Sequence, residues 1–237
     1  NVHAYAYVGE SCSGCANAGL TAIDRLTGSK LFTIYDPGFV WNGWSMNQAP
    51  VLGEQNDVLA INGGRLISFD LGAQAIRWQV SGGFTNQPSI AKGAIYAVSA
   101  GALSVRDEAT GAPLWAWGAP SGSLIGPVIV TDSHVLVRTA TTVYAIDLTS
   151  RDSVWSYPAG GHLALADGVL YVAGAAGTLT AIPAGAAPEA DLALVITDSP
   201  DPARRNRPLT YVATVANLGP AAATGIVLSI DLPSGMA

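Results

Sequence analysis

Charge is scarce in this chain. Charged residues make up 12% of its 237 residues, and among the 11 basic ones only Lys30 and Lys92 are lysines. Helix-rich cytosolic proteins carry about twice that share of charge. The formal net charge is −6, and the one arginine cluster, at 204–207, is too short to grip a nucleic-acid backbone. We therefore expect no nucleic-acid partner.

Long apolar runs are also missing. No run reaches the roughly 18–20 apolar residues that a membrane-spanning helix needs, so we expect no membrane span in these residues. No stretch keeps a 3.6-residue apolar period over eleven or more residues, which argues against helices. The 27 glycines and 14 prolines suit a chain with many tight turns instead.

The chain has only two cysteines, Cys12 and Cys15, in the segment ESCSGCANAG. A redox pair would need a helix N-terminus and a βαβ setting, which the sequence does not offer. A c-type haem would need histidine where Ala16 stands, and a zinc site would need a second pair of ligands. We favour a local disulfide that pins a hairpin loop, which indicates an oxidising compartment.

A repeat with a period of about 40 residues is the strongest positive signal. An aspartate at the end of an alternating run is followed eight residues later by a large aromatic residue, and successive aspartates are 46, 37 and 40 residues apart. Such a period is typical of stacked supersecondary units. We expect structural roles, with each aspartate accepting backbone N–H bonds in a turn and each aromatic packing between units. The four pairs are Asp24 and Phe32, Asp70 and Trp78, Asp107 and Trp115, and Asp147 and Trp155.

Short alternating strands surround each of these pairs. A complete unit has four, and the first of them follows a proline (Pro50, Pro88 and Pro127) or, in the last unit, Leu163. The units hold three, four, four, four and three strands, which predicts an all-β fold with a β-propeller of at least five units over residues 1–182. We expect further blades upstream of Asn1; a five-unit ring closed by its own terminal strands is the alternative.

The repeat pattern ends at residue 182, and a different pattern of residues follows. Residues 183–190 (PAGAAPEA) read as a linker, and residues 191–237 contain alternating runs at 191–197, 209–217 and 225–232 separated by proline turns. This pattern predicts part of an immunoglobulin-like β-sandwich. Only about half of such a domain is present, so we expect that the sequence is truncated there or that another chain completes the sheet.

The repeat pattern G-x-L-x-A-x-D-x-x-T-G-x-x-x-W resembles that of the quinoprotein-like (pyrroloquinoline-quinone) β-propellers. Residues 19–32 and 101–115 match it closely, while residues 143–155 have Ser-Arg in place of Thr-Gly. The resemblance implies a propeller, and many members of the family are cofactor-free scaffolds. Family dehydrogenases hold their quinone on the propeller axis with a calcium ion, an aspartate base and often a disulfide between adjacent cysteines. Here Ser13 and Gly14 separate the cysteines, and we expect no cofactor, no metal and no catalytic residues.

The C-terminal segment is similar to a repeat of unknown function that is common in large bacterial surface proteins. Residues 190–203, residues 209–233 and the Asn-Leu-Gly-Pro motif at 217–220 carry this likeness. The resemblance implies a secreted or wall-associated protein, so we expect an extracellular or cell-surface location.

A longer connection at residues 36–49 (DPGFVWNGWSMNQA) interrupts the repeat. Its aromatic and amide side chains, Phe39, Trp41, Asn42 and Trp44, suit carbohydrate stacking or a protein contact. The alternative is a plug that packs between two units.

These observations favour a non-enzymatic extracellular or cell-surface scaffold or adhesion protein. Its partial C-terminal sheet is expected to accept a strand from a neighbouring subunit and so to build a filament or array. A module that binds a glycan or a protein through the loop at 36–49 is the alternative, and a quinone-dependent dehydrogenase is a third hypothesis.

Overall fold

The computed structural model divides the chain into two compact units, Asn1–Ala184 and Gly185–Ala237. The predicted Cys12–Cys15 disulfide lies outside the residues that the structure describes, as do Asn42 and Trp44 of the aromatic loop. The described residues are 3–8, 18–41, 49–174, 177–183, 190–202, 207–217 and 223–230.

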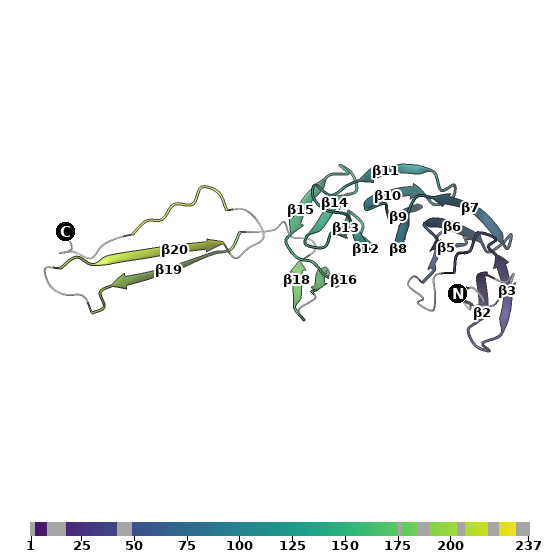
Figure 1. Ribbon diagram of the computed structural model, residues 1–237, viewed down its shortest axis with the longest axis horizontal. Coiled ribbons are helices and arrows are strands. Elements are labelled where there is room, and N and C mark those ends of the chain that lie inside the picture. The colour runs from purple at the N-terminus through teal and green to yellow at the C-terminus, as the bar shows by residue number, and fades with distance from the viewer. Residues whose placement is uncertain are drawn as a thin grey trace. The chain divides into compact units, whose positions relative to one another are not determined.

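Five antiparallel sheets make up the first unit, each formed from strands that follow one another in the chain (Figure 1). The described residues contain no helix, so the predicted all-β fold is confirmed. The sheets hold three, four, four, four and three strands, as the sequence predicts. The strands are β1 His3–Val8, β2 Gly19–Asp24 and β3 Lys30–Tyr35; β4 Val51–Leu52, β5 Asp57–Asn62, β6 Arg65–Asp70 and β7 Ala75–Ser81; β8 Phe84–Ala91, β9 Ala94–Ser99, β10 Ala102–Asp107 and β11 Pro113–Trp117; β12 Ile125–Val130, β13 His134–Arg138, β14 Val143–Asp147 and β15 Ser153–Tyr157; β16 His162–Ala166, β17 Val169–Ala173 and β18 Leu179–Pro183.

Two-residue turns set the register of several strand pairs. Between β5 and β6, Gly63 and Gly64 have φ angles of +58° and +75°, the signature of a type I′ hairpin turn. This turn type twists in the same sense as the strands that it joins, so it keeps them paired. The same pattern of two positive φ angles, with glycine second, occurs at Lys92–Gly93, Ala100–Gly101 and Asp167–Gly168.

The core lies between successive sheets and depends on strands that are buried on both faces. All six residues of β5 are buried. Val58 and Ala60 pack toward the first sheet, whereas Leu59 and Ile61 pack toward the third. Because side chains alternate along a strand, one strand serves two joints, and its sequence reads as a continuous apolar run.

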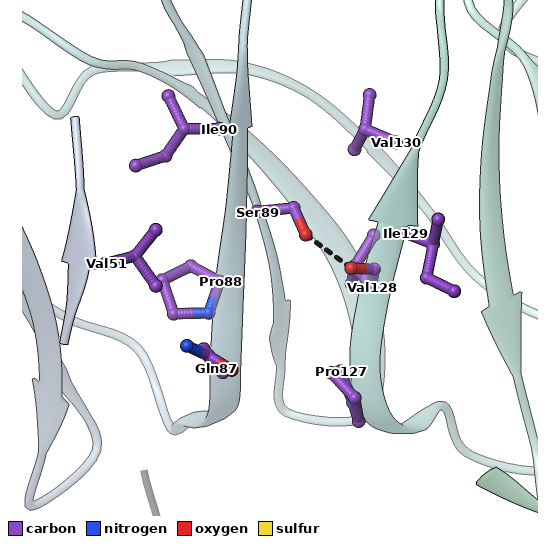
Figure 2. Close-up of a pocket in the computed structure, with 9 residues that line it drawn as sticks. All are labelled: Val51, Gln87, Pro88, Ser89, Ile90, Pro127, Val128, Ile129 and Val130. Atoms are coloured by element: carbon purple, nitrogen blue, oxygen red, sulfur yellow. Dashed lines mark hydrogen bonds between the residues drawn. The ribbon is translucent and has the colours of Figure 1, made fainter. Parts of the chain in front are cut away.

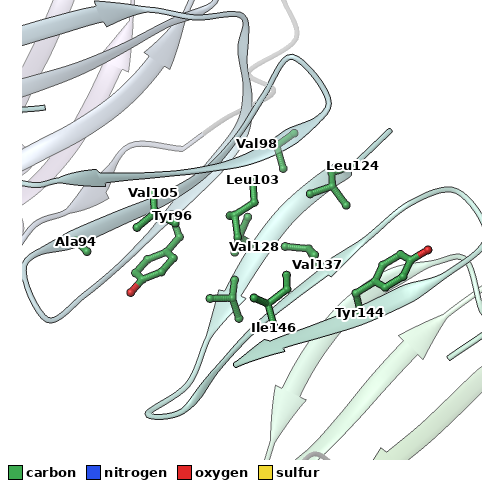
Figure 3. Close-up of a cluster of buried hydrophobic side chains, with 11 residues drawn as sticks. Ala94, Tyr96, Val98, Leu103, Val105, Leu124, Val128, Val137, Tyr144 and Ile146 are labelled. Carbon is green, nitrogen blue, oxygen red and sulfur yellow. The ribbon is translucent and has the colours of Figure 1, made fainter. Parts of the chain in front are cut away.

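The joint between the third and fourth sheets has the largest apolar cluster among the described residues (Figure 3). Leu103 and Val105 of β10 face Val137 of β13 and Ile146 of β14, and every one of them is buried. Fully burying such a side chain contributes about 1.5–3 kcal/mol. Smaller clusters of the same kind fill the other three joints.

The row of sheets stays open among the described strands. None of β1–β3 pairs with any of β16–β18. The alternative of a five-unit ring closed by its own terminal strands is therefore not what the structure shows.

In the second unit, β19 (Leu192–Ser199) and β20 (Thr210–Asn217) form one two-stranded antiparallel sheet. The predicted strand at 225–232 is not found in its described part, because residues 223–230 form no strand. The immunoglobulin-like sandwich is therefore not confirmed for the described residues. An alternating sequence becomes a strand only where a neighbouring edge accepts its backbone hydrogen bonds.

Replacing Leu103 with alanine should destabilise the first unit by about 2–5 kcal/mol, since the cavity opens inside the joint between the third and fourth sheets. Urea unfolding measures this change. The matched control is Leu26→Ala, because Leu26 is 83% exposed and its replacement should change stability by no more than about 0.5 kcal/mol. Equal effects of the two substitutions would contradict this account of the core.

Candidate functional site

The four repeat aspartates stabilise the turns that precede the last strand of each of the first four sheets, β3, β7, β11 and β15. Oδ1 of Asp24 accepts hydrogen bonds from the amides of Leu26 (2.9 Å) and Thr27 (2.8 Å). Asp70, Asp107 and Asp147 accept corresponding bonds from the turns that follow them. Hydrogen bonds from these turns lower the pKa of each of the four carboxyls. Their geometry is that of turn caps.

The four repeat aromatics lie at the joints between sheets. Phe32 packs on the core between the first two sheets, Trp115 packs between the third and fourth, and Trp155 packs between the fourth and fifth. Trp78 packs between the second and third sheets, where its Nε1 donates to the Glu108 carbonyl at 3.0 Å. These positions make the repeated pairs part of the framework, so a functional site has to be sought elsewhere.

The first segment of the aromatic loop begins at a buried carboxylate, Asp36, which is 1% exposed. The Tyr7 hydroxyl donates to its Oδ2 at 2.5 Å, and Arg65 donates to both carboxylate oxygens at 3.2 and 2.8 Å. Burial opposes ionisation of Asp36, but the bonds from Arg65, Tyr7 and the Gly38 amide outweigh it and lower the pKa of this carboxyl. Burial, followed by the bond to Asp36, raises the pKa of Tyr7 well above its ordinary value.

The residues after Asp36 are fastened to both neighbouring sheets. The ring of Phe39 packs edge-on against Tyr7, with centroids 5.3 Å apart. The Asn62 side chain holds Val40 twice, accepting from its amide at 2.7 Å and donating to its carbonyl at 2.9 Å. Trp41 comes next and is 45% exposed. Phe39 therefore behaves as a plug, whereas Trp41 stands at the surface on a fixed base.

A hollow of about 390 Å³ opens along the inner strands of the second, third and fourth sheets (Figure 2). β8 and β12 both shift register here, between Thr85 and Ser89 and between Ile125 and Ile129. The Ser89 hydroxyl donates to the Val128 carbonyl and so ties the two strands together. None of the nine lining residues is ionisable: Val51, Gln87, Pro88, Ser89, Ile90, Pro127, Val128, Ile129 and Val130.

Sequence reasoning used the prolines as repeat landmarks and did not recognise this hollow. Pro88 and Pro127 lie in the register shifts of β8 and β12, where a residue without an N–H group does not interrupt the ladder. A proline inside the first strand of two successive units is the signal that could have located the hollow. Its apolar lining suits contact better than acid–base chemistry.

Metal ligands do not gather in the described part of the chain, where no group of three or more His, Cys, Asp or Glu side chains could hold an ion. Within the same residues, no helix has the length and hydrophobicity needed to cross a membrane.

Comparison with known proteins identifies the family that the repeats resemble. Residues 2–117 match the family described as outer membrane protein assembly factor BamB. The resemblance to the quinoprotein-like β-propellers is thereby confirmed for this part of the chain. No curated protein matches the chain in sequence.

Two solved structures share the fold. BamB from Moraxella catarrhalis superposes with a TM-score of 0.57 at 15% identity, covering 72% of this chain and 56% of its own length. The computationally designed Ika4 protein superposes with a TM-score of 0.50 at 14% identity, covering 62% of this chain and 96% of its own. The chain thus spans little more than half the length of the Moraxella protein, and the likeness establishes the propeller-type fold.

Replacing Asn62 with alanine should release Val40 and raise the hydrogen-exchange rate of its amide, because both hydrogen bonds that hold it are lost. With about 1 kcal/mol for each bond, the loss of stability should be about 2 kcal/mol. Exchange measured by NMR gives the rate, and the Thr110 amide, bonded to Asp107 in a distant turn, is the internal control. Unchanged exchange at Val40 would show that Asn62 does not hold the loop.

Proposed function

We propose that this chain is a non-enzymatic scaffold that binds other proteins outside the cell or on the cell surface. The observation that carries the proposal is a half-exposed apolar face on the two-stranded sheet of the second unit, over which no second sheet lies among the described residues. The match of residues 2–117 to a family described as an assembly factor supports a role in protein contacts. The likeness of residues 190–233 to bacterial surface repeats supports the extracellular location.

The apolar face of β19–β20 follows from the register of the two strands. Leu194 lies opposite Val215, and Leu192 and Ile196 project to the same side because side chains alternate along a strand. Each large apolar member of this face is between 38% and 49% exposed. A contiguous apolar patch on a soluble protein marks an interaction site. The large apolar members of this face are Leu192, Leu194, Ile196, Tyr211 and Val215, and Ala213, Asp198 and Asn217 lie on the same side.

A second copy of this chain is the partner that we propose for this face. A two-stranded sheet is marginally stable by itself, and additional strands complete it. Among the described strands, no third strand pairs with the outer edge of β19 or of β20. An identical chain brings the same edge and the same apolar residues, so that one contact covers both copies. Such a face-to-face contact closes a pair of copies, whereas pairing of the outer edge of β19 in one copy with the outer edge of β20 in the next would repeat and build an array.

Replacing Leu194 with lysine should abolish self-association, since it places a charge in the centre of the apolar face. Sedimentation velocity over a range of concentrations measures the association of the full chain. Thr197→Lys is the matched control, because Thr197 lies in the same strand but projects to the opposite side. A wild-type chain that stays monomeric at all concentrations, or equal losses in both variants, would refute the proposal.

A binding module that uses Trp41 is the second candidate function. It is favoured by the position of this side chain, 45% exposed beside a loop base that Asp36 and Asn62 hold in place. An exposed aromatic ring on a fixed base suits stacking on a sugar ring or contact with a protein.

Replacing Trp41 with alanine should remove binding to arrayed glycans or to surface proteins without unfolding the chain. Tyr35→Ala is the matched control, since Tyr35 is 51% exposed at the end of β3 and lies before the loop. Circular dichroism verifies the fold of both variants. Binding that survives in the Trp41 variant would exclude this candidate.

A further inference from the structure

Two acidic side chains are buried together at the joint between the second and third sheets. Asp57 begins β5 and is 1% exposed, and Glu108 follows β10 and is 0% exposed. Neither belongs to the repeated pairs, to the aromatic loop or to the hollow along the inner strands. Because burying a carboxyl group without partners is costly, each of its oxygens is expected to have a hydrogen-bond donor.

In each carboxyl group, one oxygen accepts hydrogen bonds and the other has no donor. Glu108 Oε1 accepts the amides of Glu54 at 2.5 Å and Gln55 at 2.9 Å. Asp57 Oδ2 accepts the Ser68 hydroxyl at 2.7 Å. Asp57 Oδ1 and Glu108 Oε2 are buried and have no hydrogen-bond partner.

The backbone of Gly53 shows how closely the two carboxyl groups approach each other. A Cβ atom built on Gly53 would stand 2.0 Å from Asp57 Oδ1 and 2.5 Å from Glu108 Oε1. Both groups therefore converge on one side of this glycine, and the side chains interact directly. A calcium ion needs six to eight oxygen ligands, and no group of three or more acidic, His or Cys side chains that could hold an ion occurs among the described residues.

Positive charge near the pair is limited. Arg77 Nη1 lies 3.5 Å from Asp57 Oδ2, but the same guanidinium forms a closer pair with Asp70, at 2.9 Å. A further carboxyl group, besides that of Asp70, belongs to Glu54, which accepts the Gly93 amide at 2.8 Å. Two like charges buried in contact, with one shared arginine beside them, are strongly unfavourable.

We propose that Asp57 and Glu108 hold a single proton between Asp57 Oδ1 and Glu108 Oε2. Glu108 is then a neutral acid whose hydroxyl donates to the Asp57 carboxylate. Both oxygens gain the partner that they otherwise lack, and Asp57 keeps the charge that faces Arg77. The shared proton therefore adds to the stability of the joint between the second and third sheets, and its loss leaves two charges in one buried site.

The direction of the pH dependence follows from Glu108. Burial raises the pKa of Glu108, Asp57 raises it further, and the two amides oppose the rise. Because the folded chain binds this proton more tightly than the unfolded chain, the pair stabilises the fold fully below about pH 4.3, the ordinary pKa of glutamate. This contribution is lost as the pH rises through the higher pKa of the folded state. One proton changes the folding equilibrium constant by up to about tenfold per pH unit.

The test compares the full-length wild-type chain with Glu108→Gln by urea unfolding between about pH 4 and pH 8. Glutamine keeps an acceptor for the Glu54 and Gln55 amides and gives Asp57 Oδ1 a permanent donor. Relative to this variant, the wild type should lose stability as the pH rises. The repeat aspartates also make stability depend on pH, but they do so equally in both proteins, so their contribution cancels when the two profiles are subtracted. Asp132→Asn, at a fully exposed carboxylate, should keep the wild-type pH profile.

Infrared spectroscopy of the wild type gives a readout that needs no folded variant. It should show the carbonyl band of a protonated carboxylic acid that persists above the ordinary range of glutamate and disappears on unfolding. Absence of this band, or parallel pH profiles of the wild type and Glu108→Gln, would overturn the proposal. A stabilisation by calcium that Glu108→Gln abolishes would identify a cation site instead and would also overturn it.

Discussion

The first unit depends on the face-to-face packing of sheets whose middle strands, such as β5, are buried on both sides. In β5, successive side chains go alternately to the first and to the third sheet, so one strand contributes to two cores. Each sheet in the middle of the row therefore buries apolar side chains against both of its neighbours. The ends of the row show the contrast, since exposed residues alternate with partly buried ones in β16 and β18, whereas β5 is buried throughout.

The joints are also where the polar groups of the first unit meet. Asp36, on the connection after the first sheet, is bound by Arg65 of the second sheet. Glu108, after β10 in the third sheet, accepts amides from the turn that precedes β5 in the second. Trp78 adds a bond from its indole to the backbone at the same joint. Apolar packing holds the sheets together, and these directional bonds fix how one sheet sits on the next.

The number of strands was predictable from the sequence because it depends on local signals. Alternation with a period of two marks the strands, paired turn residues mark their ends, and the aspartate with its aromatic marks each unit. Contacts between units are not local. Glu108 follows a repeat aspartate and reads as an exposed turn residue, yet its carboxyl group is buried against residues 53 and 54 positions earlier. Arg65 and Asp36, 29 positions apart, gave no signal for the same reason.

The same constraint explains why the described part of the predicted third run of the second unit forms no strand. Apolar and polar residues alternate at 225–232 as they do in β19 and β20. This alternation indicates only that one side of the segment would be apolar if it formed a strand. Whether the segment becomes a strand depends on an edge that accepts it and on a layer that covers it. In the first unit each sheet covers the next. In the second unit the apolar face of β19–β20 has no second sheet among the described residues, and its side chains are accordingly about half-exposed.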